Sequence, residues 1–325
     1  GNTKMKKDIG IGLLGLGTVG SGVAEVLVTK ADNLAEQAGL PLILRKVAER
    51  DVNKRRSARL SPNVLTSNPE EVLSHPEVDI VIELIGGEHP ATEHIRQALS
   101  QGKHTITANK EVIAKHGYQL LSLARKHKVD LRYEASVGSG IPLISPFQQD
   151  LASNRISTIH AILNGTTNFI LTNMEAGRPY EEVLTEAQKL GYAEADPTAD
   201  VGGFDALAKV TILANVLMGE NLKPDDIPCK GITEITLDDI AKAKNEGKRW
   251  KLIGEIKREG GKVSASVAPM MVDLAHPLAG VMGAVNAVTF STDLMQDVTV
   301  NGPGAGKIET GYSILVDILE IHRNS

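Results

Sequence analysis

Apolar runs alternate with longer amphipathic stretches over residues 1–135 of the chain. Residues 9–14 are apolar apart from two glycines, which is typical of a strand buried on both faces of a parallel sheet. The same patterns predict strands at 9–14, 42–48, 79–85, 104–107 and 130–135, a long first helix after residue 20, and helices at 91–101 and 111–128. This alternation predicts an α/β fold with a Rossmann-like doubly wound parallel sheet.

The second part of the chain has a different order of elements. The patterns predict strands at 156–163, 249–257, 262–268, 285–290 and 298–301, and helices at 168–176, 180–190, 205–218 and 308–321. Glu259-Gly260-Gly261 separates two of these strands and is typical of a hairpin turn. We therefore expect two domains. Residues 1–135 plus 304–325 would form the dinucleotide-binding domain, and residues 136–303 a catalytic and dimerisation α+β domain with a mainly antiparallel sheet.

Composition narrows the classes of protein. The 325 residues suffice for about two domains. The net charge of −5 argues against a nucleic-acid partner, and the short basic run Lys54-Arg55-Arg56 is more typical of a solvated helix face. No apolar run reaches the ~18–20 residues that span a bilayer. The single cysteine excludes an internal disulfide and predicts a cytoplasmic protein.

A glycine-rich motif follows the first predicted strand. Gly15-Leu16-Gly17-Thr18-Val19-Gly20 lies between that strand and a helical pattern, which is the context that a dinucleotide fingerprint requires. Gly15 would allow the tight turn, Gly17 the close approach of a pyrophosphate, and Gly20 the close packing of helix and strand. The alternative is a glycine-rich turn that binds nothing.

Residues that follow strand ends are further candidates for cofactor contacts, because ligands of doubly wound sheets bind there. Glu49 would accept a hydrogen bond from the ribose of NAD, whereas Arg50 would pair with the 2′-phosphate of NADP, so both cofactors stay open. Thr107 is the last residue of another predicted strand, and Lys110 follows that strand. The segment from Gly302 to Gly306 is either a further cofactor contact or a turn between domains.

Asp205 and Lys209 lie four residues apart in a helical pattern, directly after Gly202-Gly203. This spacing places both side chains on one face of the helix. A carboxylate and an ammonium group side by side can bind a polar substrate and transfer a proton. The alternative is an ion pair on the surface, which is the commoner use of this spacing.

Taken together, several segments of the chain resemble the homoserine dehydrogenase family. The segments that carry the resemblance are the glycine motif, Thr107-Ala108-Asn109-Lys110, Glu134 to Pro142, Asn164-Gly165-Thr166-Thr167-Asn168, and Gly191 to Lys209. The resemblance implies reversible oxidation of L-homoserine to L-aspartate 4-semialdehyde with NAD or NADP, in threonine and methionine biosynthesis. It also implies that the C-terminal regulatory domain of many members is absent from this chain.

The resemblance also implies roles for individual residues. Lys209 would be the general acid and base, Asp205 would orient that end of the substrate, and Lys110 would be a second essential lysine near nicotinamide and substrate. Glu194 would bind the amino group of homoserine, and Asp200 would support the same cluster. Homoserine carries an amine, a carboxylate and a hydroxyl, so its site needs both signs of charge.

A structural monovalent cation, such as Na⁺, is a further implication of the resemblance. Its ligands would be Glu134 and the carbonyl groups of Val137, Ser139 and Ile141. One carboxylate with several backbone oxygens suits a hard cation. The alternative is a turn whose glutamate faces water.

Two other functions remain open from the sequence: a different NAD(P)-dependent dehydrogenase of amino-acid-derived aldehydes, and a non-catalytic NAD(P) sensor on the same fold. The presence of Lys110, Asp205 and Lys209 favours an enzyme over a sensor. We also expect a homodimer formed through the second domain, because its predicted strands leave a sheet edge and a sheet face to be covered.

Overall fold

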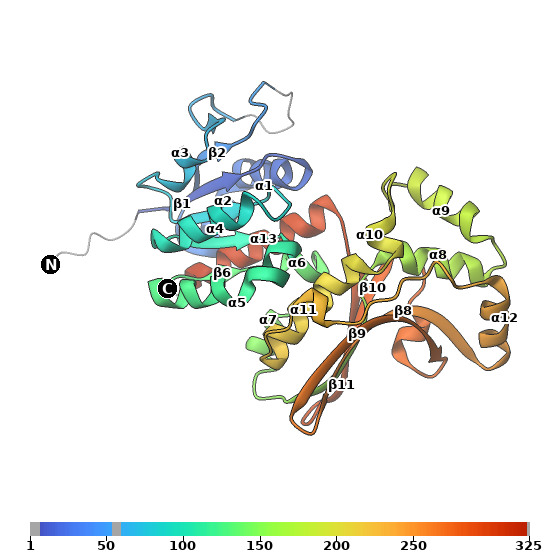
Figure 1. The fold of residues 1–325 in the computed structure, drawn as a ribbon. Coiled ribbons are helices and arrows are strands. Elements are labelled where there is room, and N and C mark those ends of the chain that lie inside the picture. Colours follow the sequence, from blue (N-terminus) through green and yellow to red (C-terminus); the bar gives the residue numbers. More distant parts are fainter. Residues whose placement is uncertain (1–6, 54–59, 324–325) are drawn as a thin grey trace. The chain divides into compact units, whose positions relative to one another are not determined.

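The computed structural model describes residues 7–53 and 60–323 and divides the chain into two compact units (Figure 1). Unit 1 consists of residues 1–136 and 306–325, and unit 2 of residues 137–305. These limits differ by one or two residues from the domain limits expected from the sequence. The basic run Lys54-Arg55-Arg56 lies outside the described residues.

Unit 1 contains a six-stranded parallel sheet with the strand order β3-β2-β1-β4-β5-β6. Its strands are β1 (Ile9–Leu14), β2 (Leu42–Ala48), β3 (Leu65–Thr66), β4 (Ile80–Glu83), β5 (His104–Thr107) and β6 (Leu131–Arg132). This is the strand order of dinucleotide-binding sheets, and it confirms the predicted fold class. All six residues of β1, at the centre of the sheet, are buried.

Helices cover both faces of this sheet (Figure 1). They are α1 (Thr18–Thr29), α2 (Ala31–Ala38), α3 (Glu70–Leu73), α4 (Ala91–Ser100), α5 (Lys110–His127) and α13 (Lys307–Arg323). One apolar core joins α1, α2 and α13 to the sheet and includes Val23, Leu34 and Ile318. A second core, on α3 and α4, includes Val72 and Ala98.

Two predictions for unit 1 were wrong in detail. The expected long first helix is two helices, because the backbone leaves helical geometry at Lys30 (φ −114°, ψ 25°). The strand expected at 130–135 is limited to Leu131–Arg132, because β6 is an edge strand that pairs only with β5 and a short helix, α6 (Ala135–Gly138), begins three residues after its end.

Unit 2 is built on a five-stranded antiparallel sheet with the order β11-β10-β7-β8-β9. The strands are β7 (Ile156–Ile162), β8 (Lys248–Glu259), β9 (Lys262–Asp273), β10 (Val285–Thr292) and β11 (Gln296–Pro303). Gly260 and Gly261 have φ of +55° and +87° and form the predicted β8–β9 turn. The second α+β domain is thus confirmed, with β7 at the centre of the sheet and β9 and β11 at its edges.

Helices α8 and α11 pack against this sheet (Figure 1). The helices of unit 2 are α7 (Ser145–Gln148), α8 (Gly165–Glu175), α9 (Tyr180–Lys189), α10 (Thr198–Val201), α11 (Phe204–Met218) and α12 (Leu237–Asn245), with short 3₁₀ turns at Pro224–Asp226 and Pro277–Gly280. Gly203 has φ +88°, so it turns the chain into α11. This turn places the start of α11, which carries Asp205, beside the end of β7.

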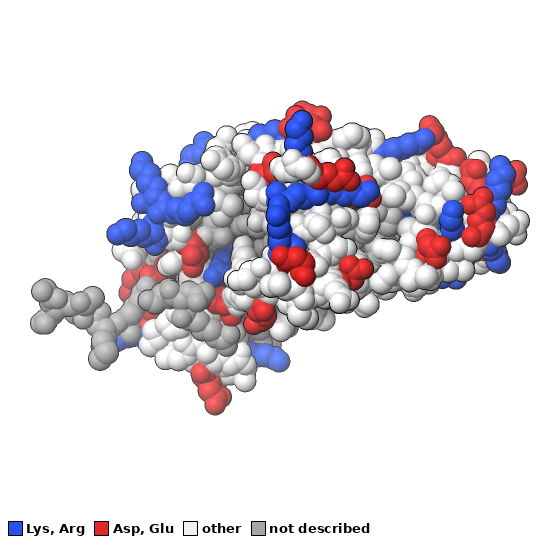
Figure 2. All heavy atoms as spheres, turned by 90° about the horizontal axis from the view of Figure 1, so that it is seen from below, with Lys and Arg blue, Asp and Glu red and all other residues white. Residues whose placement is uncertain are grey.

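Among the described residues, each helix is too short or too polar to cross a membrane. In the view of Figure 2, acidic and basic side chains form small mixed groups that are separated by broad areas of other residues.

Candidate active site

The glycine motif forms the turn between β1 and α1. Gly15 has φ +95°, a conformation that favours glycine, and a Cβ atom there would lie 2.7 Å from the carbonyl oxygen of Leu84. A Cβ atom on Gly20 would lie 2.2 Å from the carbonyl oxygen of Gly15. A Cβ atom on Gly17, in contrast, would have no heavy atom of the rest of the protein within 4 Å. These environments agree with the roles that a dinucleotide fingerprint gives to its three glycines.

The rest of the motif supplies donors for phosphate. Gly17 is the N-cap of α1, and Thr18, Val19 and Gly20 are the first helical residues, so their N–H groups lie at the positive end of the helix dipole. The backbone N–H of Leu16 donates to Oε2 of Glu49 over 2.8 Å. Glu49, for which the sequence suggested a contact with ribose, is thus bound to the glycine loop of its own chain. Arg50 follows it and is exposed.

A buried carboxylate joins the ends of β4 and β5. Glu83 is fully buried, and its Oε2 accepts from the hydroxyl of Thr107 over 2.7 Å, while its Oε1 accepts from the N–H of Ile85 over 2.7 Å. The same hydroxyl accepts from the N–H of Asn109 over 2.9 Å. The Thr107 side chain is therefore used within the protein, so contact of Thr107 with a cofactor would involve its backbone.

Asn109 then begins α5. Its side-chain oxygen accepts from the N–H of Val112 over 3.2 Å, and its side-chain nitrogen donates to the carbonyl of Gly87 over 2.7 Å. Lys110 is the first residue of the helix and is half-buried. The sequence reading missed Glu83. Its signal was an acidic residue at the end of an otherwise apolar strand, two residues before Ile85 and the Gly86-Gly87 pair.

In unit 2, Lys209 and Asp205 form an ion pair at the start of α11. The Nζ atom of Lys209 lies 2.9 Å from Oδ2 of Asp205 and donates over 2.8 Å to the carbonyl of Leu163, at the end of β7. Their side chains are only 10% and 12% exposed. This burial sets the pair apart from an exposed surface ion pair such as Lys230 and Glu234, whose side chains are 61% and 73% exposed.

Asn164 connects this pair to Asp200. Its Nδ2 atom donates to Oδ1 of Asp200 over 2.7 Å and to Oδ2 of Asp205 over 3.1 Å. The structure thus brings together Asp200, Asp205 and Lys209, three residues predicted from the sequence. Glu194 lies in the loop between α9 and α10 with an exposed side chain, and it has no hydrogen bond to these three among the described residues.

The remaining predicted residues lie elsewhere in the two units. Gly302 pairs with Asn286 in the β10–β11 hairpin, close to the end of unit 2. Of the expected cation ligands, Glu134 is buried after β6 in unit 1, and Val137, Ser139 and Ile141 are buried at the start of unit 2. Among the described residues, no group of three or more His, Cys, Asp or Glu side chains is arranged to hold a metal ion.

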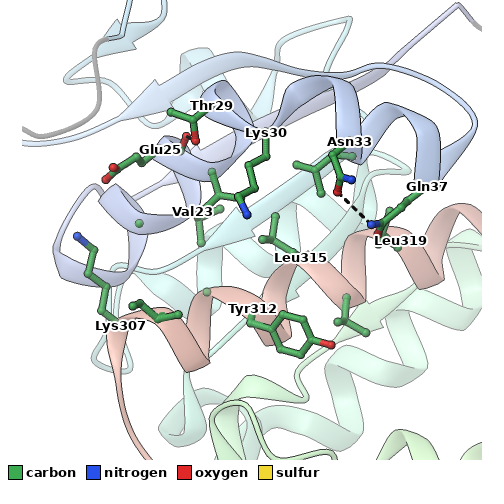
Figure 3. A pocket seen from close by; sticks show the side chains of 16 residues that line it. Val23, Glu25, Thr29, Lys30, Asn33, Gln37, Lys307, Tyr312, Leu315 and Leu319 are labelled. Carbon is green, nitrogen blue, oxygen red and sulfur yellow. Dashed lines mark hydrogen bonds between the residues drawn. The ribbon is translucent and has the colours of Figure 1, made fainter.

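Unit 1 also contains a groove of about 890 Å³ between α1, α2 and α13 (Figure 3). Apolar side chains such as Val23 and Leu315 line it, together with Lys30, Lys307 and Tyr312. It shares no lining residue with the predicted cofactor or substrate residues.

A dinucleotide-binding unit together with a buried carboxylate–lysine pair fits the class of NAD(P)-dependent oxidoreductases. Comparison with known proteins points to one family within this class. Residues 15–134 match the family model described as homoserine dehydrogenase, NAD binding domain, and residues 142–319 match the model described as homoserine dehydrogenase.

Relatives agree with these matches. The homoserine dehydrogenase of Bacillus subtilis is 43% identical over 98% of this chain and 74% of the relative. The NAD(+)-dependent homoserine dehydrogenase of Pseudomonas canavaninivorans is 42% identical over 100% of this chain and 91% of the relative. A crystal structure of a homoserine dehydrogenase from Thiobacillus denitrificans superposes with a TM-score of 0.92 at 39% identity, covering 98% of this chain and 74% of that one.

The chain therefore belongs to the homoserine dehydrogenase family. It is an NAD(P)-dependent enzyme of amino-acid biosynthesis that interconverts L-homoserine and L-aspartate 4-semialdehyde. The predicted family and reaction are confirmed, and the alternatives of a sensor and of another aldehyde dehydrogenase are set aside.

Proposed function

We propose that Lys209 is the general acid and base of this reaction and that Asp205 holds its ammonium group in place. The observation that carries this proposal is the buried pair, with Nζ 2.9 Å from Asp205 and 2.8 Å from the carbonyl of Leu163. An ammonium group has three N–H donors. Two are used among the described residues, so the third can bind the reacting oxygen of the substrate.

The chemistry assigned to Lys209 is the movement of one proton. The nicotinamide, when bound, supplies or accepts the hydride. In the reducing direction Lys209 gives its proton to the aldehyde oxygen, which becomes the hydroxyl of homoserine. In the oxidising direction it removes the hydroxyl proton. In both directions Asp205 and the carbonyl of Leu163 hold the nitrogen of Lys209 in place.

The charged ends of homoserine need further groups. The exposed carboxylate of Glu194 is proposed to bind the substrate's ammonium group, and Asp200 to support that contact. Lys110, at the start of α5, is proposed to act on nicotinamide and substrate. Gly15 to Gly20 would hold the pyrophosphate, with backbone contacts from Thr107 and Gly302.

Replacement of the lysine tests the assignment. Lys209→Ala should lower kcat by roughly 10²–10⁴-fold, the usual scale for loss of an acid/base group, in an NAD(P)H-consumption assay with aspartate 4-semialdehyde. Cofactor affinity, measured by fluorescence titration of NAD(P)H, should stay within about threefold because Lys209 is assigned to the substrate. The matched control is Lys230→Ala, which removes an exposed ion pair. Turnover of Lys209→Ala within a few-fold of the control would remove Lys209 from the mechanism.

A bound monovalent cation is proposed because buried carboxyl groups could coordinate it. Glu134 is a buried carboxylate, and the carboxyl group of Asp317, also buried, has one oxygen without a hydrogen-bond partner among the described residues. A cation beside Glu134 would offset the cost of burying negative charge there. Melting temperatures in NaCl and in choline chloride, at equal ionic strength, test this. Equal values would argue against a structural Na⁺.

The homodimer is proposed through the sheet of unit 2. Its edge strands are β9 and β11, and apolar side chains are exposed near them: Met271 on β9, Leu274 just after it, and Leu294 and Met295 between β10 and β11. Exposed edges and apolar side chains are commonly covered by a two-fold interface. A cytoplasmic location is proposed from the single cysteine alone.

A further inference from the structure

Asn164 is a residue whose side chain serves two parts of the fold at once. It follows β7 and is the N-cap of α8. Its Oδ1 atom accepts from the backbone N–H of Thr167 over 2.8 Å and from the hydroxyl of Thr167 over 2.9 Å. The oxygen therefore faces the helix, and the amide nitrogen must face away from it, toward the start of α11.

The amide nitrogen bridges two carboxylates. Nδ2 donates one hydrogen bond to Asp200, over 2.7 Å, and one to Asp205, over 3.1 Å. The Asp205 oxygen that accepts from Asn164 is Oδ2, which also accepts from Lys209 over 2.9 Å. All four hydrogen-bonding positions of the asparagine amide are thus used, and the residue is only 5% exposed.

This arrangement has an electrostatic consequence. Two carboxylates that approach the same point repel each other, and burial strengthens the repulsion. The N–H groups of Asn164 offset it, because each carboxylate receives its own donor. Without them, Asp200 and Asp205 would be expected to move apart, and Asp205 would no longer fix the ammonium group of Lys209.

We propose that Asn164 is a positioning residue of the homoserine dehydrogenase reaction, which acts through Asp205 on the direction of the Lys209 ammonium group. This inference rests on the acid/base role of Lys209 proposed above. An N-cap alone does not explain the choice of asparagine, because serine or aspartate caps a helix about equally well. Asparagine adds two donors to the capping oxygen, and both reach the carboxylates.

The two roles can be separated by substitution. Asn164→Ser keeps an oxygen that can cap α8, but its single hydroxyl cannot bridge Asp200 and Asp205. Asn164→Ala removes both the cap and the bridge. If Asn164 only capped the helix, serine would restore both the melting temperature and kcat of the alanine variant. If Asn164 positions Asp205, serine restores the melting temperature and leaves kcat low.

We therefore expect Asn164→Ser to melt within about 2 °C of the parent and to lose roughly 10–100-fold in kcat, the scale of a misplaced catalytic group. KM for NAD(P)H should change less than threefold. The matched control is Thr236→Ala, which removes the side-chain cap of α12 far from Lys209 in the sequence. It should lower the melting temperature and leave kcat unchanged.

The outcomes distinguish this inference from the one on which it rests. Asn164→Ser with parental kcat, beside an impaired Lys209→Ala, would overturn the positioning role and leave the acid/base role intact. A fully active Lys209→Ala would overturn the acid/base role itself. A low kcat in Asn164→Ser with a restored melting temperature, together with an impaired Lys209→Ala, would support both.

Discussion

The buried side chain of Lys251 allows a quantitative test of what it costs unit 2, in free energy of unfolding, to bury a charged group. This lysine lies in β8 and is 1% exposed. Its Nζ atom donates to the carbonyl of Val281 over 2.5 Å and to Oδ1 of Asn168 over 3.1 Å. Burial lowers the pKa of Lys251 from 10.5 to about 8, because the charged form loses its hydration. The folded state therefore carries a penalty whenever this lysine is protonated.

The sign and size of the effect follow from linkage. Below pH ~8 the lysine is protonated in both the folded and the unfolded chain, so the full penalty is present. Between about pH 8 and 10.5 the unfolded chain binds the proton and the folded chain does not, so stability rises with pH. At 1.36 kcal/mol for each pH unit, the penalty is about 3 kcal/mol.

Lys251→Met removes the titrating group and keeps a long side chain. The free energy of unfolding of the variant minus that of the parent should therefore fall by about 3 kcal/mol between pH 7.5 and 10.5. The assay is urea unfolding followed by the fluorescence of Trp250, the only tryptophan, which lies next to Lys251 in β8.

The control is Lys248→Met, on the same strand but with its side chain 37% exposed beside Glu246. Its effect should stay below about 0.5 kcal/mol at every pH. A difference between Lys251→Met and the parent that is constant across this pH range would refute the reasoning.

Three other predictions concern cofactor and assembly. Arg50→Ala should weaken NADP(H) binding more than NAD(H) binding, because a guanidinium group can pair with the 2′-phosphate; equal losses in a fluorescence titration would make Arg50 an ordinary surface residue. Gly17→Ala should lose cofactor affinity but keep the parental melting temperature, because its Cβ would meet no other atom within 4 Å. Gly20→Ala should have a lower melting temperature, because its Cβ would lie 2.2 Å from a carbonyl oxygen. A lower melting temperature for Gly17→Ala than for Gly20→Ala would contradict the assigned roles. Light scattering at micromolar concentration should give about twice 34.7 kDa, and a mass near 34.7 kDa would exclude the dimer under those conditions.

Local patterns in the sequence were sufficient for most of the fold. The apolar run of residues 9–14 predicted the bounds of β1, and the glycines at 260 and 261 predicted the β8–β9 hairpin. These signals are local, because strand periodicity and turn conformation depend on neighbouring residues. The division of the first helix at Lys30 was missed, because no proline or glycine marks that position.

Contacts between distant residues could not be read in the same way. Leu16 and Glu49 are 33 residues apart, and Asn164 and Asp205 are 41 apart. No periodic pattern of apolar residues predicts such a pair, because the two residues come together only when the sheets have formed. Lys251 is a sharper case, since a lysine in a strand predicts a solvated face, whereas this one is among the most completely buried side chains.

An asparagine that caps a helix and also binds a neighbouring segment occurs in both units. Asn109 and Asn164 each follow a strand and cap the next helix with the side-chain oxygen. Each turns its side-chain nitrogen outward, toward the carbonyl of Gly87 in one case and toward two carboxylates in the other. Aspartate caps as well but has no donor, and serine has only one. Asparagine can therefore anchor a helix and hold the adjoining loop with one side chain. Each asparagine also lies near a lysine proposed to act in the reaction: Asn109 directly precedes Lys110, and Asn164 shares Oδ2 of Asp205 with Lys209.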